Sequence, residues 1–134
     1  MTGVLELDKR GQFASMVIRY DDRLELDMLV ASGHMDRNCT FPITERHLEA
    51  LRDDERYLFL FAALHHPFQL RQTELSPAEV ATYLDTILFA PDDAVEAYLT
   101  TLDHGTANGA LSNLVHIYAG ADRDAMRAGS WFRK

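Results

Sequence analysis

Residues 13–31, with the sequence FASMVIRYDDRLELDMLVA, hold the pattern that decides the fold. The first half of this run is rich in β-forming residues. In the second half, apolar residues recur at every second position: Leu24, Leu26, Met28 and Val30. Such alternation is typical of a strand with one buried face. The pair Asp21-Asp22 between the halves tolerates turn geometry, so the run predicts two antiparallel strands joined by a tight turn.

Weaker strand patterns lie on either side of this hairpin. Residues 32–38 are polar and are interpreted as a loop, after which Cys39, Phe41 and Ile43 alternate with polar residues and a proline. Because Pro42 has no backbone N–H donor, this third, short strand is expected at a sheet edge, or to leave the ladder at that point. Residues 4–7, with the sequence VLEL, predict one more strand.

From Thr44 onward the pattern becomes helical. Thr44 is suited to cap a first helix that buries Leu48 and Leu51. Residues 57–64, with the sequence YLFLFAAL, are apolar on every side, which is typical of a helix buried by its neighbours or of a central strand. The alanines and the acidic residues at the start favour the helix. This second helix is expected to stop at His65-His66-Pro67, because proline disfavours the helical conformation of the residue before it.

The remaining helices are predicted from their caps. Ser76 to Glu79 combine a serine cap, a proline at the first helical position and a glutamate three residues after the cap, so a helix to about Ala90 should follow. Further helices are predicted over residues 92–102, 109–118 and 122–128. The expected fold class is α+β, with a small N-terminal antiparallel sheet, made of a hairpin plus one or two short strands, followed by five or six α-helices in a single domain over residues 1–134.

Negative charge is segregated along the chain. No lysine or arginine occurs between Arg71 and Arg123, and this stretch contains eight acids: Glu74, Glu79, Asp85, Asp92, Asp93, Glu96, Asp103 and Asp122. The other acidic residues balance the 13 basic ones, so this stretch accounts for the whole net charge of −8. Such a block attracts basic partners and repels nucleic acid and anionic membrane. Neither a nucleic-acid nor a membrane partner is therefore expected.

Catalytic and metal-binding motifs are missing from the sequence. The histidines that could be tested for a metal, His65, His66, His104 and His116, lack zinc-site spacing, and adjacent histidines on a helix point in different directions. Neither a serine-nucleophile motif nor a phosphate-binding loop is present. We therefore expect no catalytic residue, no metal and no cofactor, and the protein is not expected to be an enzyme.

Location is indicated by the N-terminus and by the single cysteine. Residues 1–10 contain acids and no long apolar run, so they form neither a signal peptide nor a transmembrane segment. Cys39 has no partner for an internal disulfide, which suits a reducing compartment, and it is expected to be a small buried apolar residue. The predicted location is the cytoplasm, and the abundance of arginine over lysine hints at a bacterial genome.

The helix that begins near Asp92 is the main candidate for a binding surface. Asp92, Glu96, Thr100 and Asp103 follow a spacing that places them on one helix face, with no basic residue between them. Glu96 and Asp103 are expected to contribute nothing to the helix itself. The predicted partner-binding residues are Asp85, Asp92, Asp93, Glu96, Asp103 and Tyr98, and the alternative is a solvated face that maintains solubility.

In layout and charge the chain resembles the immunity proteins that bacteria make against toxins. The strand-to-helix junction Phe41-Pro42-Ile43-Thr44 and the buried helix over residues 57–64 are in keeping with that type. The resemblance implies tight binding to one cognate toxin, often a basic nuclease, by occluding its active site or substrate groove. Aromatic residues could supply the affinity, and the candidates are Tyr83, Tyr98, Tyr118 and Trp131.

Two other function classes stay open at this point. The chain could be a non-catalytic regulatory module or a homodimer formed through its helical half. It could also be an enzyme of unrecognised type with a pocket of histidine, aspartate and tyrosine, since active sites need not show sequence motifs.

Overall fold

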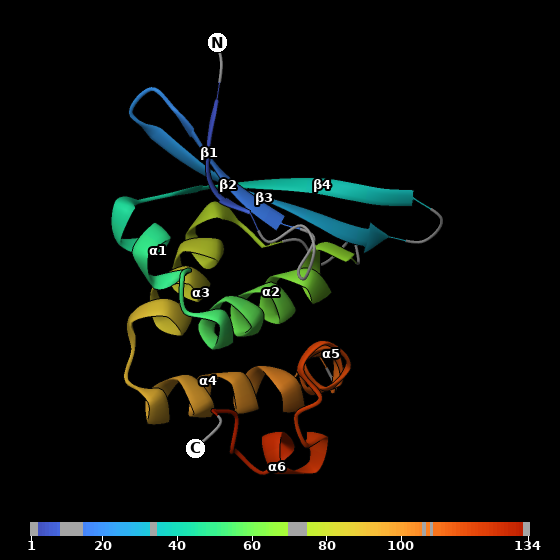
Figure 1. Ribbon diagram of the computed structural model, residues 1–134. Helices are drawn as coiled ribbons and strands as arrows, with labels where there is room; N and C mark the ends of the chain where they lie inside the picture. Colours follow the sequence, from blue (N-terminus) through green and yellow to red (C-terminus); the bar gives the residue numbers. More distant parts are fainter. Residues whose placement is uncertain are drawn as a thin grey trace.

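A four-stranded antiparallel sheet lies on one side of the protein, and six helices lie beneath it (Figure 1). The computed structural model describes residues 3–8, 15–32, 35–69, 75–105, 107 and 109–132, and these counts refer to them. The strands are β1 (Val4–Asp8), β2 (Ser15–Tyr20), β3 (Arg23–Ser32) and β4 (Met35–Ile43). The helices are α1 (Glu45–Ala50), α2 (Asp54–Gln69), α3 (Pro77–Phe89), α4 (Asp92–His104), α5 (Ala110–Ala119) and α6 (Arg123–Arg127). The predicted α+β class is confirmed.

The sheet follows the order of the chain, β1-β2-β3-β4, and every neighbouring pair is antiparallel. β2 and β3 form the predicted hairpin, and Asp21 takes the left-handed conformation, with φ 57°, that a two-residue hairpin turn requires. The part of the hairpin prediction that covers residues 13–14 falls outside the described residues. Pro42 lies on β4, at the edge of the sheet, where its missing donor costs no ladder hydrogen bond on the open side. This position was expected.

The fourth strand is longer than the sequence predicted. The polar loop expected over residues 32–38 is wrong at residues 32 and 35–38, because β3 continues to Ser32 and β4 starts at Met35, with these two residues paired. Residues 33–34 of the expected loop fall outside the described residues. Backbone hydrogen bonds to the long β3 hold this segment extended whatever its side chains are, so its polar character did not predict its structure.

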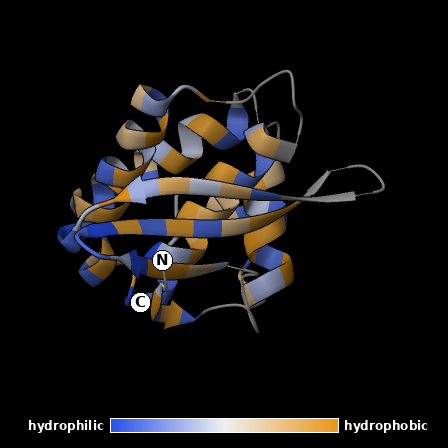
Figure 2. Cartoon of the chain, turned by 90° about the horizontal axis from the view of Figure 1, so that it is seen from above, coloured by the Kyte–Doolittle hydropathy of each residue, from blue (hydrophilic) through white to orange (hydrophobic). Residues whose placement is uncertain are grey.

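One face of the sheet packs on the helices. Pairing aligns Val17, Leu26 and Phe41 across three strands, and all three side chains are buried. Their neighbours along each strand point to the opposite face, which no described helix covers (Figure 1). Figure 2 shows the resulting change between hydrophobic and hydrophilic residues along the strands. The sheet therefore contributes one apolar face to the core.

Helix α2 lies at the centre of the protein. The sheet packs on one side of it, and α3, α4 and α5 pack on its other sides (Figure 1). Every side chain from Tyr57 to Leu64 is buried, as predicted, because this helix has a neighbour in each direction. The buried hydroxyls of Tyr57 and Ser15 are hydrogen-bonded to each other and join α2 to β2. At 16 residues α2 is the longest described helix, and none of these helices is both long and apolar enough to cross a membrane.

Helix α2 passes through Pro67, so the predicted stop at that residue is wrong. Proline cannot donate to the carbonyl of Ala63, which weakens the helix at this point. Phe68 is nevertheless buried, and its ring lies 5.1 Å from that of Phe41 in an edge-to-face contact. Packing of the last turn against the sheet offsets the lost hydrogen bond.

The predicted helix caps are confirmed. The hydroxyl of Thr44 accepts from the His47 N–H at 3.3 Å, and Leu48 and Leu51 of the first helix are buried. Ser76 and Glu79 form a capping box in which each side chain accepts from the other residue's backbone N–H. These short-range contacts fix where α1 and α3 begin.

Candidate functional site

Helices α3 and α4 are consecutive, pack against each other and carry exposed acidic residues. Neither helix contains a lysine or an arginine. We define the α3–α4 surface by four exposed acids and two half-buried tyrosines: Glu79, Asp85, Asp92, Asp93, Tyr83 and Tyr98. Four of the predicted partner-binding residues belong to this surface: Asp85, Asp92, Asp93 and Tyr98.

The two tyrosines meet where α3 and α4 pack. The ring centroids of Tyr83 and Tyr98 are 5.8 Å apart, and the rings are nearly perpendicular, at 88°. Burial, with the neighbouring Tyr83 as a second cause, raises the pKa of Tyr98 to about 12. Burial and Glu79 also raise the pKa of Tyr83. Both phenols stay protonated at neutral pH and can donate hydrogen bonds to a ligand or partner.

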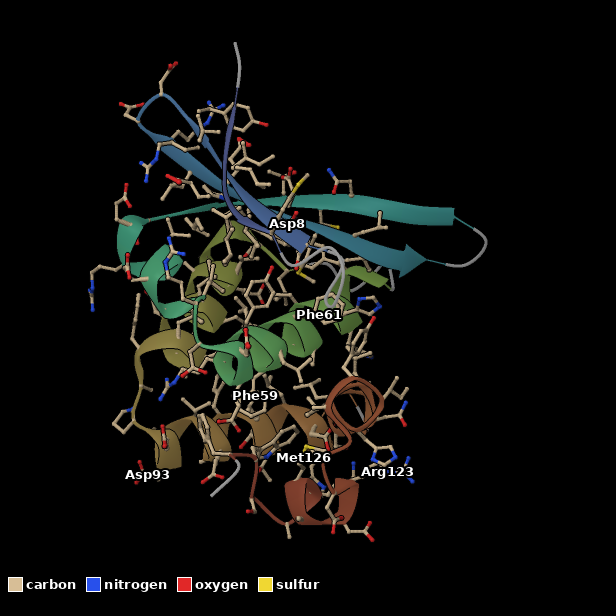
Figure 3. The ribbon with its side chains drawn as sticks, viewed as in Figure 1. Asp8, Phe59, Phe61, Asp93, Arg123 and Met126 are labelled. Carbon is tan, nitrogen blue, oxygen red and sulfur yellow. The ribbon has the colours of Figure 1, made fainter. Side chains whose placement is uncertain are left out.

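Asp92 and Asp93 lie side by side at the start of α4 but have different partners. Asp92 pairs with Arg56 of α2 at 2.7 Å, and the same guanidinium donates to the carbonyl of Ala90 at 2.8 Å. Arg56 thus joins the α3–α4 connection to the central helix through an ion pair and a hydrogen bond. Asp93 is exposed at the outer end of α4 (Figure 3), where its side chain accepts only from the next residue among the contacts described. Among the contacts described, Asp93 makes none to another helix, so its charge is available to a partner.

Asp85 lies on the side of α3 that faces α1. Its carboxylate accepts from Nε2 of His47 at 2.8 Å, while Nδ1 of the same ring accepts from the Thr44 N–H at 3.0 Å. These two contacts assign the proton of the neutral imidazole to Nε2. Both ring nitrogens are thus in use, which leaves no lone pair on His47 for general-base catalysis.

Asp103 is not part of an accessible surface, and its prediction as a partner-binding residue is wrong. The residue has an exposed fraction of 0%. Its carboxylate pairs with Arg127 of α6 at 3.1 Å and accepts from the Ser112 N–H of α5 at 3.0 Å. The charge is neutralised and hydrogen-bonded inside the protein, so it cannot meet a partner.

Glu96 also has a structural role, contrary to the expectation that it contributes nothing to its helix. Its carboxylate accepts from the backbone N–H groups of Trp131 at 2.7 Å and Phe132 at 3.1 Å. The Trp131 indole donates to Thr100 one turn further along α4 at 2.9 Å. The chain's own C-terminal segment, which includes the buried Met126 of α6 beneath α4 (Figure 3), thus covers Glu96, Thr100 and Asp103 of the predicted acidic face. Asp92 of the same face is exposed.

The candidate aromatic anchors also differ in how accessible they are to a partner. Trp131 is buried in the core, with its ring edge-to-face against Phe59 at 6.0 Å, and is not available to a partner. Tyr118 is 45% exposed but lies on α5, away from the α3–α4 surface. Only Tyr83 and Tyr98 combine partial exposure with neighbouring acids.

Two of the histidines considered as metal ligands, His104 and His116, contact backbone carbonyls of the chain itself. His104 contacts the carbonyl of Arg127 at 2.6 Å, and His116 contacts the carbonyl of Ala121 at 2.8 Å. Burial, with His66 as a second cause, lowers the pKa of His65. Within the described ranges no group of three or more potential ligands could hold a metal ion. Cys39 is buried in the core, as predicted.

Sequence reasoning missed two basic residues that shape the site. His47 occupies the third position after the Thr44 cap, where a capping box usually has glutamate or glutamine, so the cap spacing could have located it. Arg56 gave no local signal, because its contacts to α3 and α4 are 31 to 36 residues distant in sequence.

Fold and site together describe an α+β protein with an acidic, tyrosine-bearing helical surface. The chain belongs to DUF6357, a family of unknown function, and the match covers residues 2–130. No curated protein and no solved structure matches the chain.

Proposed function

We propose that this protein binds a basic protein through the α3–α4 surface and acts as a bacterial immunity protein. In this proposal it neutralises a toxin, such as a basic nuclease, in the cytoplasm by occluding the toxin's active site or substrate groove. The observation that carries the proposal is the charge of α3 and α4, which present Glu79, Asp85 and Asp93 to solvent and have no basic residue of their own.

Electrostatic complementarity is consistent with this role. An acidic surface speeds encounter with a basic partner and fixes its orientation, whereas affinity comes from a few desolvated side chains. Tyr83 and Tyr98 are suited to the second task, since each offers a rigid ring and a hydroxyl that stays protonated.

A binding role also fits the state of the histidine–aspartate pair. His47 and Asp85 are the nearest approach to an acid–base pair on this surface, yet both imidazole nitrogens already have partners. A general base must keep a lone pair within reach of a substrate proton. This arrangement favours a binding protein over the enzyme that the sequence left open.

The proposal is tested by charge reversal at Asp93. The product of the gene upstream is co-expressed with the wild-type protein and with Asp93→Lys, and complex formation and protection are measured across a salt series. Asp93→Lys should slow association and weaken its salt dependence, because opposite charge steers encounter. Asp124→Lys is the matched control, since Asp124 is also an exposed acid in the first turn of a helix, but on α6.

Thermal melts of both variants separate binding from folding. If no basic protein is captured, or if Asp93→Lys binds and protects as well as Asp124→Lys at every salt concentration, the α3–α4 surface is not the interface and the proposal fails.

A further inference from the structure

A hollow of about 530 Å³ lies between α1 and α3, at the margin of the α3–α4 surface. Asp85 and Phe89 line it from α3, and Arg46 and His47 line it from α1. It thus combines an exposed carboxylate with an aromatic ring. These are the two features that proteins use to recognise a guanidinium group.

The hollow already holds a guanidinium from the chain itself. The guanidinium carbon of Arg46 lies 4.4 Å from the ring centroid of Phe89, within cation–π distance. His47 stacks nearly parallel to the same ring at 5.2 Å and keeps it in place. Arg46 is an exposed residue, so its side chain can move aside without unfolding α1. The contact shows that a planar cation fits against Phe89.

The carboxylate in the hollow is held in a fixed position. Asp85 is 63% exposed at its side chain, and the hydrogen bond from His47 orients it. Since His47 is itself fixed by the Thr44 N–H, the carboxylate is preorganised, which reduces the entropic cost of ordering it on binding. Glu45 also lines the hollow, and its hydrogen bond from Arg19 lowers its pKa.

We propose that this hollow receives an arginine side chain of the basic partner, with the guanidinium paired to Asp85 and stacked on Phe89 in place of Arg46. This inference rests on the proposed function and adds the residue type by which the partner is recognised. Arginine fits better than lysine, because its planar group can pair with a carboxylate and stack on a ring at the same time.

The proposal is tested with a small probe that does not require the partner. The ¹⁵N-labelled full chain is titrated with N-acetyl-arginine amide and, separately, with N-acetyl-citrulline amide, which has nearly the same shape without the charge. Arginine amide should give saturable shifts at the amides of His47, Asp85 and Phe89. Citrulline amide should leave these resonances unchanged.

Two variants connect the shifts to the hollow. Asp85→Asn keeps an acceptor for His47 and removes only the charge, and it should weaken binding of arginine amide by at least about threefold. Phe89→Leu keeps an apolar wall without the ring and should weaken binding as well. Asp124→Asn removes one exposed acid elsewhere, and binding should be unchanged.

The inference is overturned if arginine amide gives no saturable shift at the hollow, if citrulline amide binds equally well, or if Asp85→Asn and Asp124→Asn behave alike. Failure of the proposed function gives a different result: binding of no basic protein depends on Asp93, while arginine amide still binds the hollow. A partner whose binding is weakened by Asp93→Lys but not by Asp85→Asn would be consistent with the proposed function and would contradict only the arginine site.

Discussion

Arg127 donates from Nη1 to Oδ2 of Asp103 at 3.1 Å and neutralises a carboxylate that has no exposed surface. The pair joins α6 to α4 across 24 residues of sequence. Asp103 was expected to face a partner because it shares one helix face with Asp92, Glu96 and Thr100, with no basic residue between them. The basic residue instead comes from the C-terminal segment, so the charge is paired inside the fold and does not contribute to an interface.

Removal of Arg127 should be strongly destabilising. Arg127→Met keeps most of the aliphatic chain but leaves Asp103 as an uncompensated buried charge, which costs about 3 kcal/mol or more. Urea unfolding measures the loss. Arg123→Met is the matched control, because Arg123 is exposed and donates only to Asn113 among the contacts described, and its cost should stay within about 0.5 kcal/mol.

The double variant Asp103→Asn with Arg127→Met separates charge from packing. It removes the buried charge, so it should recover part of the stability that Arg127→Met loses. Equal stabilities of Arg127→Met and Arg123→Met would show that Asp103 is solvated and not buried.

The central helix should be intolerant of truncation. Phe59 (labelled in Figure 3) and Leu60 are buried in the core, and the ring centroids of Phe59 and Phe132 are 5.1 Å apart. Phe59→Ala or Leu60→Ala should lower the free energy of unfolding by about 2 to 5 kcal/mol, through lost burial and the cavity left behind. Ile117→Ala removes a side chain from a residue that is 65% exposed and should cost far less. Similar losses at Leu60 and Ile117 would contradict the assigned core.

His65 should make stability depend on pH. Its Nδ1 is buried and has no hydrogen-bond partner among the residues that the structure describes, and burial lowers its pKa. Above the unfolded-state pKa of about 6.5 the ring is neutral in both states, so its contribution to stability is fully present. As pH falls below this value the unfolded chain takes up the proton first, and the contribution is lost through the lower folded-state pKa.

The test compares wild type with His65→Leu. Between about pH 7.5 and about pH 5.5, a range that spans the unfolded-state pKa of histidine, the free energy of unfolding should fall more for the wild type. At the higher pH the variant should be at least as stable, because it removes an unsatisfied polar atom. An equal fall in both proteins would exclude His65 as the source.

The elements that the sequence predicts well depend on neighbours within four residues. The cap at Ser76 needs only Glu79, the hairpin turn needs only Asp21-Asp22, and Pro42 lacks its donor in any fold. The predictions that failed depend on remote contacts. Pro67 remains helical because Phe68 packs on β4, and residues 35–38 are extended because β3 pairs with them.

The difference between local and remote contacts also explains which parts of the candidate site the sequence predicted. The helical spacing of Glu96 and Asp103 was inferred correctly, and the structure places both on the side of α4 that meets the C-terminal segment. What covers that side could not be inferred, because Trp131 lies 35 residues beyond Glu96 and carries no signal of its destination. The part of the prediction that stays open to test consists of Asp85, Asp92, Asp93 and Tyr98.

Different residues of the α3–α4 surface should control the association rate and the dissociation rate of the complex. Charge acts mainly on encounter, whereas buried anchors act mainly on the lifetime of a complex. Asp93→Lys should therefore lower kon and leave koff nearly unchanged. Tyr98→Ala should raise koff by about tenfold or more, the effect of an anchor that contributes at least about 1.4 kcal/mol, with little change in kon.

Tyr118→Ala is the matched control for Tyr98→Ala, because each variant loses one partly exposed tyrosine and one edge-to-face contact, with Phe61 in the first case and Tyr83 in the second. Both variants should lose similar stability in a thermal melt, so a difference in koff reflects the partner alone. Surface plasmon resonance with the captured toxin gives both rates. If Tyr118→Ala raises koff and Tyr98→Ala does not, the partner sits on α5, and the acids of α3 and α4 only steer its approach.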